Sequence, residues 1–306
     1  MINLKRKVIQ IADSTQLISL PRAWAKKNNI LKGQELDVVE DGNKVVVYTN
    51  TAPRLNTIEI DLSGLTPRLA DRFLGRAYHA GYDELIISFD ELEVGRALQE
   101  KVPELLGFEI FDQSRNQLVI KSLSQKLEID FDSALRKAFI IAISMADTVA
   151  EALAKGDKKS LSHVKYRDVD LNKFCYFCLR AINKGQYREM DNRILYYLIE
   201  TLEDIGDAYK ELAEACLKAT PGEKVLRGLQ RVNQIFKLSY EFFYKPDKKK
   251  AVDTYAKFEE TRQFLISISR NHGANEGRLI AVLDYLLRLI YHYVTMRLDT
   301  LQEFRN

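Results

Sequence analysis

The stretch that decides the fold reads Lys5-Arg6-Lys7-Val8-Ile9-Gln10-Ile11, then Leu17-Ile18-Ser19-Leu20-Pro21-Arg22, then Glu35-Leu36-Asp37-Val38-Val39-Glu40. Short apolar runs separated by turn residues predict four strands, over 4–11, 17–20, 35–40 and 44–48. Pro21 suits the first turn of a short helix over 22–28, and Asp41-Gly42-Asn43 predicts a hairpin turn. Residues 1–50 are too few to bury much apolar surface alone. We therefore expect this unit to pair with a second copy.

Positive charge is concentrated in the same segment. Residues 1–30 hold six basic side chains and one acid, Asp13, so their net charge is +5, whereas that of the whole chain is +3. A local basic surface indicates a polyanionic partner, and we favour nucleic acid over a merely solvated face. Trp24, the one tryptophan, is assigned to packing within the dimer rather than to base stacking. The candidate DNA-binding residues, on the first strand and the short helix, are Lys5, Arg6, Lys7, Arg22, Lys26 and Lys27.

The composition fits a soluble protein of two or three domains. The 306 residues are 46% hydrophobic and 29% charged, as is usual for globular chains. No apolar run approaches the length of a membrane span, and the start of the chain does not resemble a signal peptide. Three cysteines cannot form a disulfide framework, which favours a cytoplasmic protein with reduced thiols.

A small α/β domain is expected at 54–125, after a linker at 52–54. The pattern predicts strands over 58–62, 85–89, 108–112 and 117–123. One helix begins at Thr66-Pro67 and ends near Gly81, and a second covers 91–106, where Pro103 shortens or bends it. The domain contains no glycine-rich phosphate loop and no catalytic set, so its role is not readable from composition.

Residues 129–306 are expected to form an all-α bundle. An apolar stripe at helical spacing covers 131–153, and five further helices are expected near 163–184, 190–218, 222–244, 248–271 and 276–304. Short connections between six helices favour antiparallel neighbours, in two three-helix units at 131–218 and 222–304. The predicted fold class is therefore multidomain α+β, with a strand-rich N-terminal domain, an α/β layer and a helical bundle.

The sequence offers no catalytic machinery. Cys175 and Cys178 form a CxxC pair, but they share the apolar stripe of their helix and Cys216 is the only other thiol. We interpret them as buried, inert thiols rather than as zinc ligands. The four histidines are scattered, and no nucleophile is paired with a base. We expect that the protein is not an enzyme and holds no cofactor.

A stripe of acids runs along the helix at 190–218, opposite its apolar face. We interpret it as the solvated outer face of the bundle. The alternative is a surface cation site, because carboxylates three and four residues apart on a helix can share a hard metal ion. The members of this acidic stripe are Glu200, Glu203, Asp204, Asp207, Glu211 and Glu214.

Residues 3–48 closely resemble the AbrB/MazE/SpoVT swapped-hairpin DNA-binding domain. The resemblance is carried by Arg6-Lys7-Val8, Ser14-Thr15, Ile18-Ser19-Leu20-Pro21 with Trp24, and Leu31-Lys32-Gly33-Gln34-Glu35-Leu36. Asp13 stands where the family often has glycine. The resemblance implies a dimeric swapped-hairpin β-barrel, an intertwined homodimer whose basic residues bind double-stranded DNA.

The rest of the chain resembles archaeal-type PhoU-related regulators, which join such a domain to a helical PhoU region. The resemblance rests on Gly107-Phe108-Glu109-Ile110, on Asp168 with Arg180, and on Glu203-xxx-Asp207. It implies a surface metal near Asp168, Glu203 and Asp207. Two departures weaken that site, since Asn172 follows Asp168 by four residues and Arg288 and His292 occupy the equivalent positions of the second unit.

Three hypotheses about function follow. The leading one is a cytoplasmic, homodimeric, DNA-binding transcription regulator linked to phosphate uptake, or to a related signal sensed by the PhoU-like region, with a signalling protein as a further partner of the bundle and no membrane insertion. The alternative is a phosphate-signalling adaptor that docks on a transporter or kinase, its N-terminal domain serving only for dimerisation. The third is a metal-binding protein.

Overall fold

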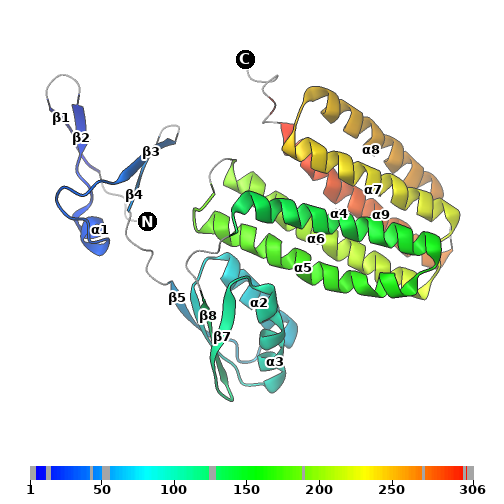
Figure 1. Cartoon of the computed structure of the whole chain (residues 1–306), viewed down its shortest axis with the longest axis horizontal. Helices are drawn as coiled ribbons and strands as arrows, with labels where there is room; N and C mark the ends of the chain where they lie inside the picture. The colour runs from blue at the N-terminus through cyan, green and yellow to red at the C-terminus, as the bar shows by residue number, and fades with distance from the viewer. Residues whose placement is uncertain are drawn as a thin grey trace. The chain divides into compact units, whose positions relative to one another are not determined.

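The computed structural model describes residues 5–11, 15–41, 44–49, 56–123, 129–187, 190–270, 273–298 and 301. The chain divides into two compact units, Met1–Leu55 and Asn56–Asn306, here the N-terminal and C-terminal units. Figure 1 shows the helices and strands of both. In the part of the chain that is described, no helix is both long and apolar enough to cross a bilayer.

The N-terminal unit contains two antiparallel strand pairs and one short helix. β1 (Val8–Ile11) pairs with β2 (Thr15–Ile18), and β3 (Asp37–Asp41) pairs with β4 (Lys44–Tyr48). Helix α1 (Arg22–Lys27) begins directly after Pro21, as expected of a residue whose fixed φ suits the first turn. The strands and helix were thus predicted in the right order, with ends that differ by a few residues.

The predicted barrel is not present within one chain. The described residues form two separate two-stranded sheets, and closing a barrel requires every strand to have a neighbour on both sides. Every residue of β1 and β2 is exposed, and α1 has no buried residue. The described residues of one copy therefore do not form a hydrophobic core of the size that usually stabilises a sheet.

The C-terminal unit begins with an α/β layer over 56–123. Its sheet has the order β5-β6-β8-β7, in which β5 and β6 are parallel and the other neighbours antiparallel. Alternate residues of the two central strands, Leu85, Ile87, Leu118 and Ile120, are fully buried, as the two-residue period of a strand requires. The elements are β5 (Thr57–Asp61), α2 (Pro67–His79), β6 (Glu84–Ser88), α3 (Leu92–Lys101), β7 (Phe108–Gln113) and β8 (Gln117–Ser122).

Proline explains the one helix of the layer that is shorter than predicted. The helix expected over 91–106 ends at Lys101 and continues as a 3₁₀ turn, η1 (Val102–Glu104), with Pro103 at its centre. Proline lacks the N–H that would continue the α-helical ladder, and its ring crowds the preceding turn. The turn brings Glu104 next to Lys101, and the two side chains form an ion pair.

Six long helices, here the helical region, complete the unit and run side by side in Figure 1. Contacts link α4, α5 and α6 to one another and α7, α8 and α9 to one another, and the pairs α4–α7 and α6–α9 join the two groups. An aspartate caps the N-terminus of α4, α5, α6 and α8 by accepting a backbone N–H, which is a strong start signal. The helices are α4 (Phe131–Lys155), α5 (Lys158–Asn183), α6 (Asn192–Lys218), α7 (Glu223–Tyr244), α8 (Lys248–Ile268) and α9 (Ala274–Thr295).

Helices α5 and α6 pack especially closely at Gly206. A Cβ atom at this position would clash with Cδ2 of Leu171 and lie 3.3 Å from Oδ1 of Asp168. Glycine therefore allows the two backbones to approach where the acidic residues of α5 and α6 meet.

Candidate nucleic-acid interface and the acidic face of the helical region

All six candidate DNA-binding residues are exposed. Arg22, Lys26 and Lys27 lie on α1, as predicted. The other three do not lie on the first strand, because β1 begins at Val8 and residues 5–7 precede it. An exposed lysine or arginine can bring its charge to a phosphate at little desolvation cost.

Exposed apolar side chains accompany these cations. Val8 and Ile18 face each other in the β1–β2 register, and each is 62% exposed. Leu31 and Val45 are 75% and 66% exposed. Trp24 is half-buried. So many exposed aliphatic residues in so small a unit are typical of a surface that takes part in protein–protein contact.

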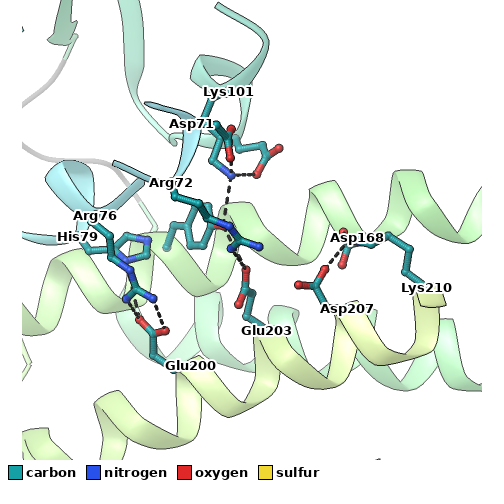
Figure 2. Close-up of polar contacts among 12 residues, drawn as sticks. Asp71, Arg72, Arg76, His79, Lys101, Asp168, Glu200, Glu203, Asp207 and Lys210 are labelled. Carbon is teal, nitrogen blue, oxygen red and sulfur yellow. Dashed lines mark hydrogen bonds and ion pairs between the residues drawn. The ribbon is translucent and has the colours of Figure 1, made fainter. Parts of the chain in front are cut away.

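The acidic stripe is not wholly an outer face, and the prediction was wrong for its first half. Helix α2 of the α/β layer lies against it, as Figure 2 shows. Arg76 forms two hydrogen bonds with the Glu200 carboxylate, of 2.5 and 3.0 Å, and Arg72 lies 3.7 Å from Glu203. Glu203 is only 9% exposed. The second half, Glu211 and Glu214, is exposed as expected.

Two of the carboxylates that the PhoU resemblance would place near a metal contact a lysine of the chain. The ammonium of Lys210 contacts the carboxylates of both Asp168 and Asp207 (Figure 2). Burial raises the pKa of Asp168, and the hydrogen bond from Lys210 opposes that shift. Within the described residues, no group of three or more His, Cys, Asp or Glu is arranged to hold a metal ion. Lys210 and Arg72 supply positive charge next to these carboxylates.

Arg180 does not pair with Asp168, although the two were considered together in the sequence. Its guanidinium reaches the α/β layer, where it lies 2.5 Å from Asp83 and donates to the carbonyls of Tyr78 and Tyr82. Asp168 and Arg180 are both on α5 but twelve residues apart, so they contact different partners.

A buried network joins the layer to the helical region and was not predicted. Lys101 on α3 donates to Glu104 (2.8 Å) and to the Tyr176 hydroxyl (3.2 Å), which in turn donates to Glu203 (3.2 Å). Burial raises the pKa of Glu203 to about 7, and the neighbouring Asp207 adds to the effect. Lys101 follows the buried Val94 and Leu98 at helical spacing, a signal that could have revealed its burial.

His79 is the other unpredicted residue at this junction. It is 4% exposed, and neither ring nitrogen has a hydrogen-bond partner. Its ring is tilted against Tyr176, with centroids 4.5 Å apart. Burial, helped by the charges of Arg76 and Lys101, lowers the pKa of His79 to about 3, so the imidazole is neutral at physiological pH.

The cysteines lie where the sequence indicated. Cys175, Cys178 and Cys216 are free and buried. Burial raises the pKa of Cys175 and Cys178, which suppresses the reactive thiolate.

Comparison with known families adds one finding. Residues 9–54 match the family model described as antidote-toxin recognition MazE, bacterial antitoxin, a segment that lies within the N-terminal unit and covers less than half of the chain. Searches of curated proteins and of solved structures gave no match. The N-terminal unit is therefore similar to the MazE/AbrB class of small antitoxin domains, which confirms that part of the sequence-based resemblance. The PhoU-like character of 129–306 stays a prediction.

Proposed function

We propose that this protein is a homodimeric transcription regulator that binds double-stranded DNA through its N-terminal unit. The observation that carries the proposal is the coincidence of six exposed cations with exposed apolar strands in the N-terminal unit, which matches the MazE family model from residue 9 to residue 54. The exposed apolar residues support contact with a second copy of the chain, and the cations support binding to nucleic acid.

Dimerisation strengthens the electrostatic argument. Two copies supply twelve basic side chains, and each one that reaches a phosphate releases condensed counterions from the duplex. Binding should therefore weaken steeply as salt concentration rises. The rest of the chain has a net charge of −2 beyond residue 30, so it adds little to this attraction.

The test is duplex DNA binding across a salt series, with the full chain and with an Arg22→Ala, Lys26→Ala variant. Each lost phosphate contact should lower the slope of log affinity against log salt by about 0.9. Lys32→Ala is a matched control, because Lys32 is an exposed lysine of the same unit outside the candidate set. Absence of binding at low salt, or an unchanged slope in the double variant, would refute the proposal.

A protein-binding role is the second candidate. The matched family is described by its recognition of a toxin, so a domain of this type can serve a protein partner. In that case the chain is an adaptor that docks on a transporter or kinase, with the N-terminal unit serving only for dimerisation. Recovery of such a protein by the tagged full chain, with no DNA binding at any salt, would favour the adaptor.

We further propose that the C-terminal unit supplies the signal and that this signal is related to phosphate. Support comes from the resemblance at residues 107–110 and at Glu203 and Asp207 alone. The proposal assigns the protein to the cytoplasm, without catalytic activity or a cofactor of its own. Mapping genomic binding sites in phosphate-rich and phosphate-starved cells tests it, and sites that avoid phosphate-transport genes would count against it.

A further inference from the structure

The α/β layer is held to α5 by buried, multiply bonded groups. Arg180 is 8% exposed and Asp83 is 7% exposed, and the guanidinium also lies over the rings of Tyr78 (5.0 Å) and Phe108 (4.8 Å). Lys184 on the same helix lies 2.5 Å from Asp83. These contacts surround the C-terminal end of α2. Breaking them would leave buried charges without their partners.

Two more contacts link the layer to the same part of α5. The side-chain amide of Asn183 donates to the carbonyl of His79 (2.7 Å). Lys101, 6% exposed, reaches the Tyr176 hydroxyl. The layer is thus attached to α5 over more than one helical turn.

The contacts with α6 are of a different kind. They come from α2 through Arg72 and Arg76, whose side chains are 51% and 61% exposed, and through Nδ1 of the buried His79, which lies 3.9 Å from Oε1 of Glu200. Ion pairs with such an exposed partner are screened by salt, and of the two the bidentate Arg76–Glu200 pair is the stronger contact. The Arg72–Glu203 pair, at 3.7 Å, is also beyond hydrogen-bond range.

Under this weak edge lies an imperfectly packed space. Its volume is about 20 Å³, and one of its lining residues is His79, whose ring nitrogens have no hydrogen-bond partner. Buried polar atoms without partners make the closed arrangement less favourable than a fully bonded one. Local opening follows the least stable contacts, so the α6 edge should open before the α5 attachment.

We propose that the α/β layer is a hinged lid, fixed along α5 by the Arg180 contacts and released from α6 by breaking the Arg72 and Arg76 ion pairs, which uncovers His79. Opening turns the covered half of the acidic stripe, Glu200 and Glu203, toward solvent. The lid proposal does not depend on the proposed DNA-binding function, because all the residues of the lid belong to the C-terminal unit.

His79 itself reports the opening. Diethyl pyrocarbonate acylates a neutral imidazole that it can reach, and peptide mass spectrometry measures each histidine separately. In the full chain, we expect slow modification of His79 that accelerates about threefold or more in an Arg72→Gln, Arg76→Gln variant and also on raising NaCl. His163 is exposed and gives the reference rate under each condition.

Two controls separate lid opening from other events. Glu151→Gln removes an exposed ion pair with Lys155 on α4 and should leave the His79 rate unchanged. The buried thiols of Cys175, Cys178 and Cys216 should stay unreactive in every variant. An unchanged His79 rate in the double variant overturns the proposal. So does an increase matched by thiol modification, because the helical region would then be unfolding as a whole.

Discussion

Arg180 of α5 and Asp83, just beyond α2, form an ion pair of 2.5 Å in which both side chains are only 9% exposed. The same guanidinium also donates hydrogen bonds to two backbone carbonyls at the C-terminal end of α2. One side chain therefore neutralises a buried acid and caps a helix, and it joins elements nearly one hundred residues apart in the sequence.

Replacement of Arg180 by Met should lower the free energy of unfolding of the C-terminal unit by about 1–3 kcal/mol, because the carbonyls of Tyr78 and Tyr82 lose a donor and the buried Asp83 keeps Lys184 as its remaining cation. Urea unfolding followed by circular dichroism measures the loss. Arg193→Met is the matched control, because Arg193 pairs with Asp191 at the surface with its side chain 91% exposed, and should change stability by less than about 1 kcal/mol. Equal effects of the two variants would contradict the assigned role of Arg180.

His79 should make the fold less stable in acid. The pKa of His79 is about 3 in the folded chain, against an ordinary value of 6.5. Below pH 6.5 the imidazole therefore binds a proton in the unfolded chain but stays neutral in the folded chain. The resulting loss grows as pH falls from 6.5 toward 3. His79→Phe removes this loss and should gain about 2 kcal/mol over wild type at pH 5 relative to pH 7.5. Urea midpoints that differ by the same amount at both pH values would contradict the assignment.

Glu203 should change stability with pH in the opposite direction. Its pKa of about 7 lies above the ordinary 4.5, so the unfolded chain releases its proton first and stability falls as pH rises from 4.5 to 7. Glu203→Gln should therefore be more stable than wild type at pH 8, by on the order of 2–3 kcal/mol, with the difference vanishing near pH 4.5. The exposed Glu214→Gln serves as control. If the Glu203→Gln difference is independent of pH, the carboxyl is already ionised in the fold.

Gly206→Ala should destabilise the helical region by about 1–3 kcal/mol, because the added methyl group would clash with Leu171 where α5 and α6 cross. Thermal unfolding of the variant measures the loss. Leu171→Ala introduced together with Gly206→Ala should recover part of it relative to the sum of the single changes, since the two residues share one space. Strict additivity would show that the clash is not the cause.

Ile18→Asp should convert the proposed dimer into a monomer. Ile18 is exposed in the single chain and faces Val8 across the β1–β2 pair, and a carboxylate there would be buried unpaired in a dimer interface. Sedimentation velocity measures the change. Gln16→Asp, two residues earlier on the same strand and exposed, should remain dimeric. A monomeric wild type would contradict both the interface and the proposed regulator.

Much of the architecture could be predicted because local sequence patterns determine where its helices and strands lie. Alternation in β6 and β8, helical spacing in α4, and the turn residues around Pro21 and Gly81 each place an element within a few residues. The basic residues of the N-terminal unit were visible as composition, and the family match of residues 9–54 agrees with the resemblance found there.

The junction between the layer and α6 could not be predicted for a physical reason. Each of its contacts joins residues far apart in the sequence, as Arg76 with Glu200 or Arg72 with Glu203, and no local period encodes which helix will lie over which. An acidic face looks solvated in a sequence until the cations that cover it are known. For the same reason Lys210, only three residues from Asp207, was overlooked as the cation shared with Asp168.

Trp24, half-buried on α1, is the one tryptophan of the chain, while fourteen of the fifteen tyrosines belong to the C-terminal unit. Excitation at the red edge of the indole band would therefore illuminate only the N-terminal unit, and tyrosine absorbance would report almost entirely on the other. The two units thus have separate optical signatures, with which a titration or a melting curve can show whether they respond together or apart.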